Sequence, residues 1–179
     1  CEQLIKLAHG RLPIIVDPKG RNYQQYKGAT VLTPNLKELV EVSGKALKTQ
    51  AEIIEVTQAL QKELKIESIL ITQGSQGMTL FEAEKEPKHI PTQAREVYDV
   101  SGAGDTVVAT LATSLASGVR LSEACRLANA AAGIVVGKVG TATVSAAELE
   151  KAMDHGQFLH TDQKVLTREQ AFELLKDWR

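Results

Sequence analysis

The sequence predicts an α/β fold in which a mostly parallel central sheet is covered by helices on both faces. Short apolar runs alternate along the chain with longer segments of helical periodicity, instead of being segregated from them. These runs are apolar throughout, which is typical of strands buried on both faces of a parallel sheet. Each expected element is taken below in chain order.

The first forty residues predict two strands, each with a neighbouring helix. Residues 3–8 have a helical pattern, and residues 13–17 (PIIVD) form a short apolar run that predicts a buried strand. Residues 30–33 (TVLT) predict a second strand, and a helix over residues 36–40 follows at once. A strand that leads directly into a helix is the repeating unit of an α/β protein.

A longer helix is expected to begin after Thr49. Thr49 and Glu52 have the spacing of a capping box, in which the glutamate reaches back to the first turn. Behind them, apolar residues recur on one helical face: Ile53, Val56, Leu60 and Leu64.

The middle of the chain predicts a third buried strand and a glycine turn. Residues 68–72 (SILIT) form the strand, Gly74 and Gly77 mark the turn, and residues 78–81 (MTLF) form a further apolar run.

The remaining elements are predicted to be helical. Residues 103–117 and 121–137 read as two alanine-rich helices, and Ser145 with Glu148 forms a second capping box that opens a shorter helix. From Gln157 onward the chain becomes polar and aperiodic, and a last helix is expected to begin at Thr167. Residues 157–179 therefore predict a linker followed by a helix.

Composition excludes several classes of function. The 179 residues include 21 Lys and Arg against 22 Asp and Glu, and this balance does not favour nucleic acid as a partner. No apolar stretch is long enough to span a membrane. The two cysteines, Cys1 and Cys125, are too few for a disulfide framework and predict a cytoplasmic protein. Because the chain does not begin with Met, we expect it to be a piece of a longer protein.

The most informative motif is SGAGDT, at the start of the first alanine-rich helix. Gly102 and Gly104 let a ligand approach the backbone, and the free N–H groups of a helix start attract phosphate. Asp105, in the same first turn, can accept a proton from an attacking hydroxyl while those amides hold the developing charge. The alternative from spacing alone is a glycine turn whose aspartate only caps the helix. The sequence lacks a P-loop, and Val107 stands where a dinucleotide fingerprint needs glycine.

With its flanking residues, this motif resembles the C-terminal signature of the ribokinase-like family of carbohydrate kinases. The resemblance implies a three-layer α/β/α fold, with Gly102, Ala103 and Gly104 as an anion hole and Asp105 as the catalytic base. It also implies ATP as substrate, with Mg²⁺. The residues that it assigns to the nucleotide are Asn35, Leu36, Lys37 and Glu38 of an Asn-x-x-Glu motif, Thr72, Gly74 and Gly77 of a glycine turn, and Asn129 beside the adenine; Glu38 is also assigned to the metal.

A narrower resemblance is to the kinase half of bifunctional heptose 7-phosphate kinases and heptose 1-phosphate adenylyltransferases. It rests on three stretches: VDPKG at 16–20, LTPN at 32–35 and AAAGIVVGKVGT at 130–141. It implies phosphorylation of heptose 7-phosphate at C1, in ADP-heptose synthesis for the lipopolysaccharide core, by a homodimer. Residues 1–156 would then be the ATP-side portion of the kinase domain, without its N-terminal half and sugar lid. Residues 157–179 would lead toward a nucleotidyltransferase domain.

Simpler interpretations stay open for these residues. Asn35 can be a helix cap with Glu38 on a solvated face, Gly74 and Gly77 can only shape a hairpin, and Asn129 can be a hydrogen-bonded core residue. Lys19, just after a predicted strand, can contact phosphate or be solvated. Two other functions also remain, namely a ribokinase-like enzyme for another sugar or a nucleoside, and a non-catalytic packing module.

Overall fold

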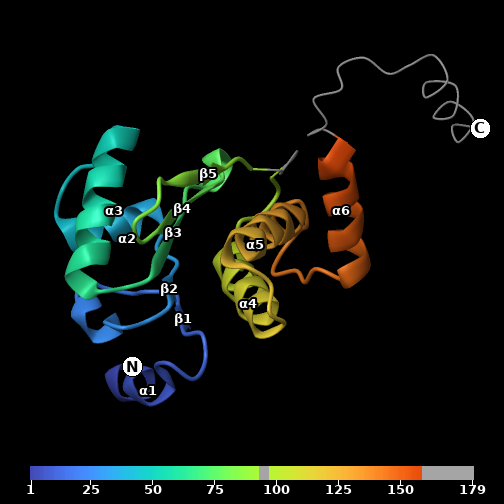
Figure 1. The fold of residues 1–179 in the computed structure, drawn as a ribbon. Helices are drawn as coiled ribbons and strands as arrows, with labels where there is room; N and C mark the ends of the chain where they lie inside the picture. The colour runs from blue at the N-terminus through green and yellow to red at the C-terminus, as the bar shows by residue number, and fades with distance from the viewer. Residues whose placement is uncertain (93–96, 159–179) are drawn as a thin grey trace, which may run out of the picture.

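One five-stranded sheet with two apolar faces organises the fold. The structure is a computed structural model that describes residues 1–92 and 97–158 (Figure 1). The strand order follows the chain: β1 (Ile15–Val16), β2 (Val31–Leu32), β3 (Ser68–Thr72), β4 (Met78–Glu82) and β5 (Lys88–Ile90).

The sheet is mixed, with β3 at the junction. β1, β2 and β3 pair in parallel, whereas β3 pairs with β4, and β4 with β5, in antiparallel. A parallel connection needs a crossover of a dozen or more residues, and the turn over residues 73–77 is too short for one. The expected parallel arrangement therefore holds for β1–β3, and the hairpin side of the described sheet is antiparallel.

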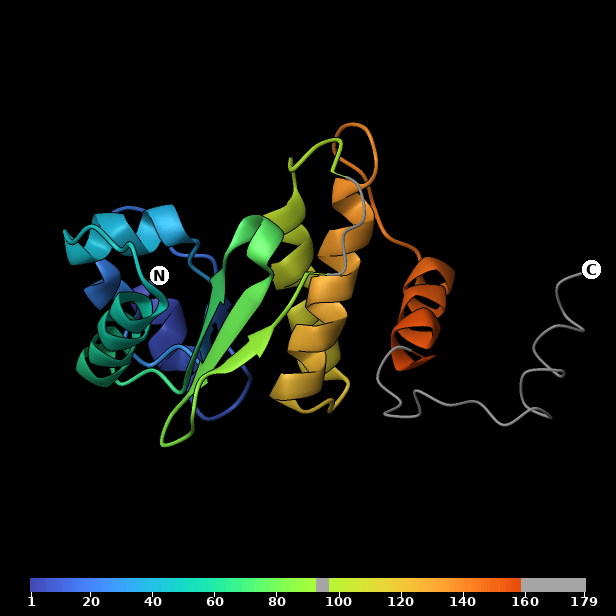
Figure 2. The ribbon, with the colours of Figure 1, turned by 90° about the horizontal axis from the view of Figure 1, so that it is seen from above.

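Helices cover both faces and form the outer layers (Figure 2). α2 (Leu36–Ser43) and α3 (Gln50–Leu64) lie on one side of the sheet, and α4 (Ala103–Ala116) and α5 (Leu121–Val136) lie on the other. α6 (Ala146–Phe158) packs beside α5. The remaining elements are α1 (Glu2–Ala8) and two short 3₁₀ helices, η1 (Tyr23–Tyr26) and η2 (Gly74–Gln76). The predicted α/β/α layering is confirmed.

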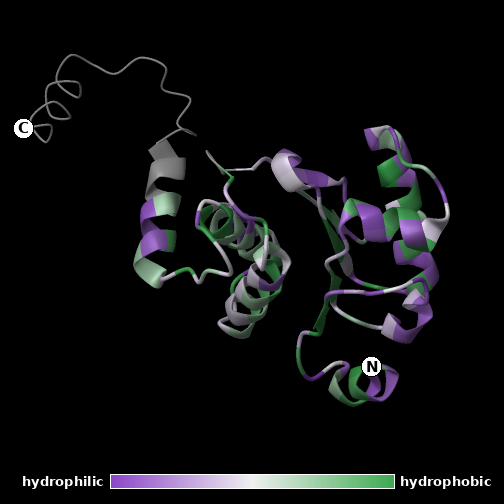
Figure 3. Cartoon of the chain, turned by 180° about the vertical axis from the view of Figure 1, so that it is seen from behind, coloured by the Kyte–Doolittle hydropathy of each residue, from purple (hydrophilic) through white to green (hydrophobic). Residues whose placement is uncertain are grey.

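The two faces of the sheet carry two separate apolar clusters, because successive side chains of a strand point to opposite faces. Ile69, Ile71 and Phe81 face α2 and α3, whereas Leu70 and Leu80 face α4 and α5. Figure 3 shows green strands between the helical layers, while α2 and α3 carry both green and purple segments. The apolar runs of β3 and β4 therefore serve two cores at once, which explains why they lack polar alternation.

The core beneath α4 and α5 is built largely from small side chains. Ala124, Cys125 and Ala128 of α5 are fully buried against this face of the sheet. Burial raises the pKa of the Cys125 thiol to about 12. Cys125 is therefore a small buried hydrophobe, as one expects for an unpaired cysteine in an alanine-rich helix.

The capping signals of the sequence are confirmed. Thr49 Oγ1 accepts a hydrogen bond from Glu52 N (3.2 Å), and Glu52 Oε2 accepts one from Thr49 N (2.8 Å). Ser145 and Glu148 pair in the same way before α6.

Several of the described elements differ from the predictions. β5 and η1 were not expected, because neither has an apolar run or helical periodicity. α6 continues to Phe158, so Gln157 is helical and the linker predicted over residues 157–179 does not begin there. The rest of that segment, residues 159–179, lies outside the described residues. None of the helices that the structure describes has the length and apolar character needed to cross a bilayer.

Candidate functional site

The carboxyl ends of β1, β2 and β3 bring three chain segments to one edge of the sheet. Asp17 and Lys19 follow β1, Asn35 follows β2, and the glycine turn follows β3. Two contacts join the segments that follow β2 and β3, since Thr72 N donates to Pro34 O (3.0 Å) and Asn35 forms a parallel bridge with Thr72. In open α/β sheets this edge is where ligands bind.

Asn35 and Glu38 form a reciprocal cap at the start of α2. Asn35 Oδ1 accepts from Glu38 N (3.0 Å), and Glu38 Oε2 accepts from Asn35 N (2.8 Å). The capping interpretation of Asn35 is therefore confirmed. A solvated Glu38 is wrong, because its side chain is only 12% exposed.

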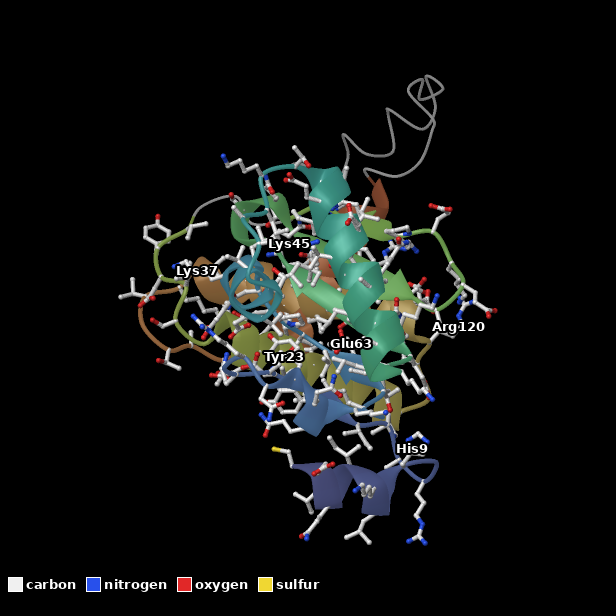
Figure 4. All side chains as sticks on the ribbon, turned by 90° about the vertical axis from the view of Figure 1, so that its left-hand side faces the viewer. His9, Tyr23, Lys37, Lys45, Glu63 and Arg120 are labelled. Atoms are coloured by element: carbon white, nitrogen blue, oxygen red, sulfur yellow. The ribbon has the colours of Figure 1, made fainter. Side chains whose placement is uncertain are left out.

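The two residues between them have different environments. Leu36 packs against the apolar core, whereas Lys37 lies on the exposed side of α2. Figure 4 labels Lys37 beside α2, apart from Tyr23. Of the four predicted nucleotide residues in this motif, Lys37 is therefore the one most open to a ligand.

Lys19 joins two carboxylates from different elements. Its Nζ lies 2.6 Å from Glu38 Oε1 and 3.0 Å from Asp17 Oδ2. The hydrogen bond to Glu38 is the main cause of a raised pKa at Lys19, against the opposing effect of burial. The backbone of Lys19 is also fixed, because its N–H donates to Tyr26 Oη and its carbonyl accepts from the Tyr26 hydroxyl, both at 3.2 Å.

A buried hydroxyl lies near this cluster. Tyr23 is 2% exposed, and its Oη has no hydrogen-bond partner among the residues that the structure describes. Its pKa is raised, chiefly by burial and next by the charge of Glu38. Tyr23 is therefore neutral and is part of the apolar core that contains Leu39 and Ile53.

The glycine turn after β3 contains two glycines with different roles. Gly77 has φ +87°, and a Cβ built there would lie 2.2 Å from Ile90 O and 2.6 Å from Thr92 N. Gly74 has φ +58° with nothing within 4 Å of such a Cβ, so a ligand can approach it. The hairpin interpretation therefore accounts for Gly77, whereas Gly74 and the half-exposed Thr72 border open space.

The start of α4 has the geometry that the GAGD motif predicts. Gly102 adopts a left-handed conformation (φ +78°), and α4 begins at Ala103 without a capping side chain from any described residue. Gly104 has open space around it, and Asp105 is exposed in the first turn. N–H groups of a first helical turn that lack such a cap can accept an anion.

The loop before α4 is held on both sides. Asp99 Oδ1 accepts from Ser101 N (2.8 Å), and this bond is the main cause of a lowered pKa at Asp99. Tyr98 N and Asp99 N both donate to Val136 O at the end of α5. A Cβ at Gly102 would lie 3.3 Å from Thr141 Cγ2, so the loop after α5 closes over the start of α4.

Asn129 is a core residue that ties α5 to the hairpin. It is 3% exposed, and its Nδ2 donates to Pro91 O (2.7 Å). The core interpretation is therefore confirmed by geometry. A contact with adenine stays a prediction.

These residues form two groups: the sheet edge with Asp17, Lys19, Glu38 and Thr72, and the α4 start with Asp105.

Comparison with known proteins identifies the family of the chain. The sequence profile of the family described as pfkB family carbohydrate kinase matches residues 1–148. The chain belongs to this family. The ribokinase-like fold predicted from the motifs is confirmed by the similarity to solved ribokinase structures described below.

Curated pfkB relatives are similar over nearly the whole chain. A bifunctional protein HldE from Rhodospirillum rubrum is 51% identical over 176 residues, covering 97% of this chain and 36% of that protein. An HldE from Vibrio parahaemolyticus is 48% identical over 174 residues, with the same two coverages. The chain therefore spans about a third of the length of these relatives.

Solved pfkB-like structures share the fold. Arabidopsis thaliana ribokinase, solved with ribose and ATP, has a TM-score of 0.77 and 26% identity, covering 84% of this chain and 51% of that one. Thermotoga maritima ribokinase has a TM-score of 0.70 and 26% identity, covering 86% and 53%.

Two features at the edge of the sheet were missed by sequence reasoning. Asp17 had a detectable signal, because a carboxylate directly after a buried strand lies at the ligand-binding edge. The clamp of Tyr26 on Lys19 had none, because it depends on how η1 folds back over the turn.

A separate hollow of about 550 Å³ lies beside the glycine turn, on the α3 side. Gln50, Gln73 and His89 are among its lining residues, and all of the lining side chains are neutral or weakly basic. Gln73 Oε1 already accepts from the Thr79 hydroxyl (2.6 Å). No carboxylate is among the described residues that line this hollow.

Proposed function

We propose that the complete protein is an ATP-dependent kinase that phosphorylates the C1 hydroxyl of D-glycero-D-manno-heptose 7-phosphate. The observation that carries the proposal is the uncapped start of α4, with Asp105 exposed in the same turn. The HldE relatives and the resemblance to heptose 7-phosphate kinases favour a heptose phosphate over ribose as the acceptor. As in those enzymes, the product would enter ADP-heptose synthesis.

In this proposal, the backbone and Asp105 divide the chemistry between them. The N–H groups of Gly102 and Gly104 would hold the negative charge of the transferring phosphoryl group. The N–H of Ala103, which the motif also assigns to the anion hole, donates to Val100 O (3.2 Å) in this structure. Asp105 accepts the proton of the C1 hydroxyl as that oxygen attacks the γ-phosphorus, and the bond to the β-phosphate oxygen breaks. ADP leaves with that oxygen.

Glu38 is the residue that would hold Mg²⁺ together with the nucleotide phosphates. Mg²⁺ prefers oxygen ligands and is commonly held by one or two carboxylates and substrate phosphates. Glu38 Oε1 already bonds an ammonium group at 2.6 Å, so a cation fits at this oxygen. When bound, the metal supplies charge neutralisation for the phosphates. Lys37, Thr72 and Gly74 border the same edge and would contact the nucleotide.

The test is Asp105→Asn in the complete protein. We expect kcat for heptose 7-phosphate phosphorylation to fall by about 10²-fold or more, because the amide cannot accept the proton. ATP affinity, measured by calorimetry, should change little. Glu150→Gln, at an exposed carboxylate of α6, is the matched control and should leave kcat unchanged. Near-normal turnover of Asp105→Asn would contradict the assignment.

A further inference from the structure

The cluster of Asp17, Lys19 and Glu38 contains two carboxylates and one ammonium group. The carboxylates come from different elements, Asp17 from the end of β1 and Glu38 from the first turn of α2. Their oxygens converge on a single nitrogen at 3.0 and 2.6 Å. One positive charge therefore neutralises only half of the negative charge at this point of the sheet edge.

The ammonium group is the exposed and replaceable member of the cluster. The Lys19 side chain is 67% exposed, against 31% for Asp17 and 12% for Glu38. Glu38 is held in place independently, because its other oxygen caps Asn35 N. Removing the ammonium group would therefore leave the Glu38 carboxylate close to its present position.

The surrounding residues favour replacement of the Lys19 ammonium group by a cation from solution over rearrangement of the turn. The turn that carries Lys19 is fixed through its backbone by Tyr26, so it does not depend on the side chain. Arg21, the nearest cation along the chain, lies 3.6 Å from Glu41 on the next turn of α2 and is engaged there. A cation that replaces Lys19 would thus come from solution.

We propose that Lys19 is an exchangeable internal cation, whose ammonium group holds Asp17 and Glu38 together until a divalent metal ion displaces it. The inference rests on the proposed function, in which Glu38 serves Mg²⁺. Lys19 is then a positioning residue that acts through the two carboxylates. It lowers the affinity of the site for free metal and keeps the carboxylates poised for it.

The experiment measures Mn²⁺ binding to the complete protein by electron paramagnetic resonance, without nucleotide. Lys19→Met should bind Mn²⁺ about threefold to tenfold more tightly than the wild type, the size expected when one ammonium charge leaves a water-exposed ion pair. Lys19→Arg, which keeps the charge, should bind as the wild type does. Lys27→Met removes one exposed charge from the loop before β2 and should also leave the affinity unchanged.

A double variant separates this mechanism from a general charge effect. In Lys19→Met/Glu38→Gln the tighter binding should disappear, because the carboxylate that gained the metal is gone. The inference is overturned by an unchanged or weaker affinity in Lys19→Met, by an equal gain in Lys27→Met, or by a gain that survives in the double variant. A kinase assay of the wild type tests the proposed function independently of the Mn²⁺ measurement. Activity with no Mn²⁺ effect would overturn only the role of Lys19, whereas the Mn²⁺ effect without activity would overturn the proposed kinase.

Discussion

Gly77 is the residue whose backbone geometry leaves the least freedom. Its φ of +87° disfavours any side chain, and a Cβ would collide with the backbone of Ile90, Pro91 and Thr92. Gly74, three residues earlier, shares the left-handed φ but has open space around it. A side chain at Gly74 would therefore meet backbone strain alone, whereas one at Gly77 would meet both strain and a steric collision.

We expect Gly77→Ala to be far more destabilising than Gly74→Ala. The Gly74 variant should lose only about 1 kcal/mol of unfolding free energy, the cost of a left-handed alanine. The Gly77 variant adds the displacement of the β5 backbone, so its loss should be several-fold larger. Urea denaturation of both variants in the complete protein measures the difference, and equal losses would show that the hairpin accommodates the added methyl group.

Cys125 should make the folded state less stable at alkaline pH. Its pKa is raised to about 12 from an ordinary value near 9, so between these pH values the unfolded chain loses the thiol proton while the folded chain keeps it. The free energy of unfolding should then fall as pH rises, by up to about 1.4 kcal/mol per pH unit.

The comparison with Cys125→Ala isolates this effect from other alkaline groups, including Tyr23, whose pKa is also raised. The stability advantage of the wild type over the variant should shrink between pH 8.5 and about pH 10.5 in urea denaturation. An advantage that stays constant over this range would contradict a buried neutral thiol.

At the scale of elements, α2 and α3 begin with the same capping box, but only α2 lies at the candidate site. Glu38 and Glu52 each accept a hydrogen bond from the N-cap residue, and Glu38 also bonds Lys19. Glu38→Gln and Glu52→Gln should both cost at most about 1 kcal/mol of stability, because glutamine can still cap. Only Glu38→Gln should raise the Mg²⁺ concentration for half-maximal kinase activity. Equal magnesium titrations for both would leave Glu38 a structural cap.

The sequence predicts these elements well where the signal is local. The boxes at Thr49 and Ser145 depend on residues three positions apart, and the structure contains both. β5 has no such signal, because Lys88 and His89 are polar and the strand forms only by pairing with β4. The direction of β4 is equally invisible to an apolar run, although the shortness of its turn implies it.

The candidate site also has parts that the sequence predicts and parts that only the structure shows. Motifs predict the α4 start and the Asn35 cap, because each lies within one turn of the chain. The contact of Lys19 with Glu38 depends on the parallel register of β1 and β2 and on the fold of η1 over Lys19. No pattern in the sequence contains that register, so this contact required the structure.

At the scale of the whole molecule, one edge of the described sheet is open. β1 pairs with β2, and no other described strand pairs with it. Leu4, Leu7 and Leu12, just before this strand, are between 68% and 71% exposed. A strand with one open edge, near exposed leucines, is a surface that recruits other chains.

The 179-residue chain produced alone should therefore self-associate. Light scattering should report species larger than a monomer, and Leu4→Lys/Leu7→Lys should shift them toward the monomer. A kinase assay on the same sample should show no heptose 7-phosphate phosphorylation. A monodisperse and active monomer would contradict this prediction.

The junction at β3 has a consequence for the order of folding. Thr72 meets Met78 across a single short turn, whereas Leu32 reaches Ile69 only after the whole of α2 and α3. The hairpin side has low contact order and the parallel side has high contact order, so loop closure delays the parallel pairings. We therefore expect the β3–β4 hairpin to form first, with β3 in place before β2 and β1 dock on it. The sheet edge that carries Asp17, Lys19 and Glu38 would then be assembled last, although its residues precede the hairpin in the chain.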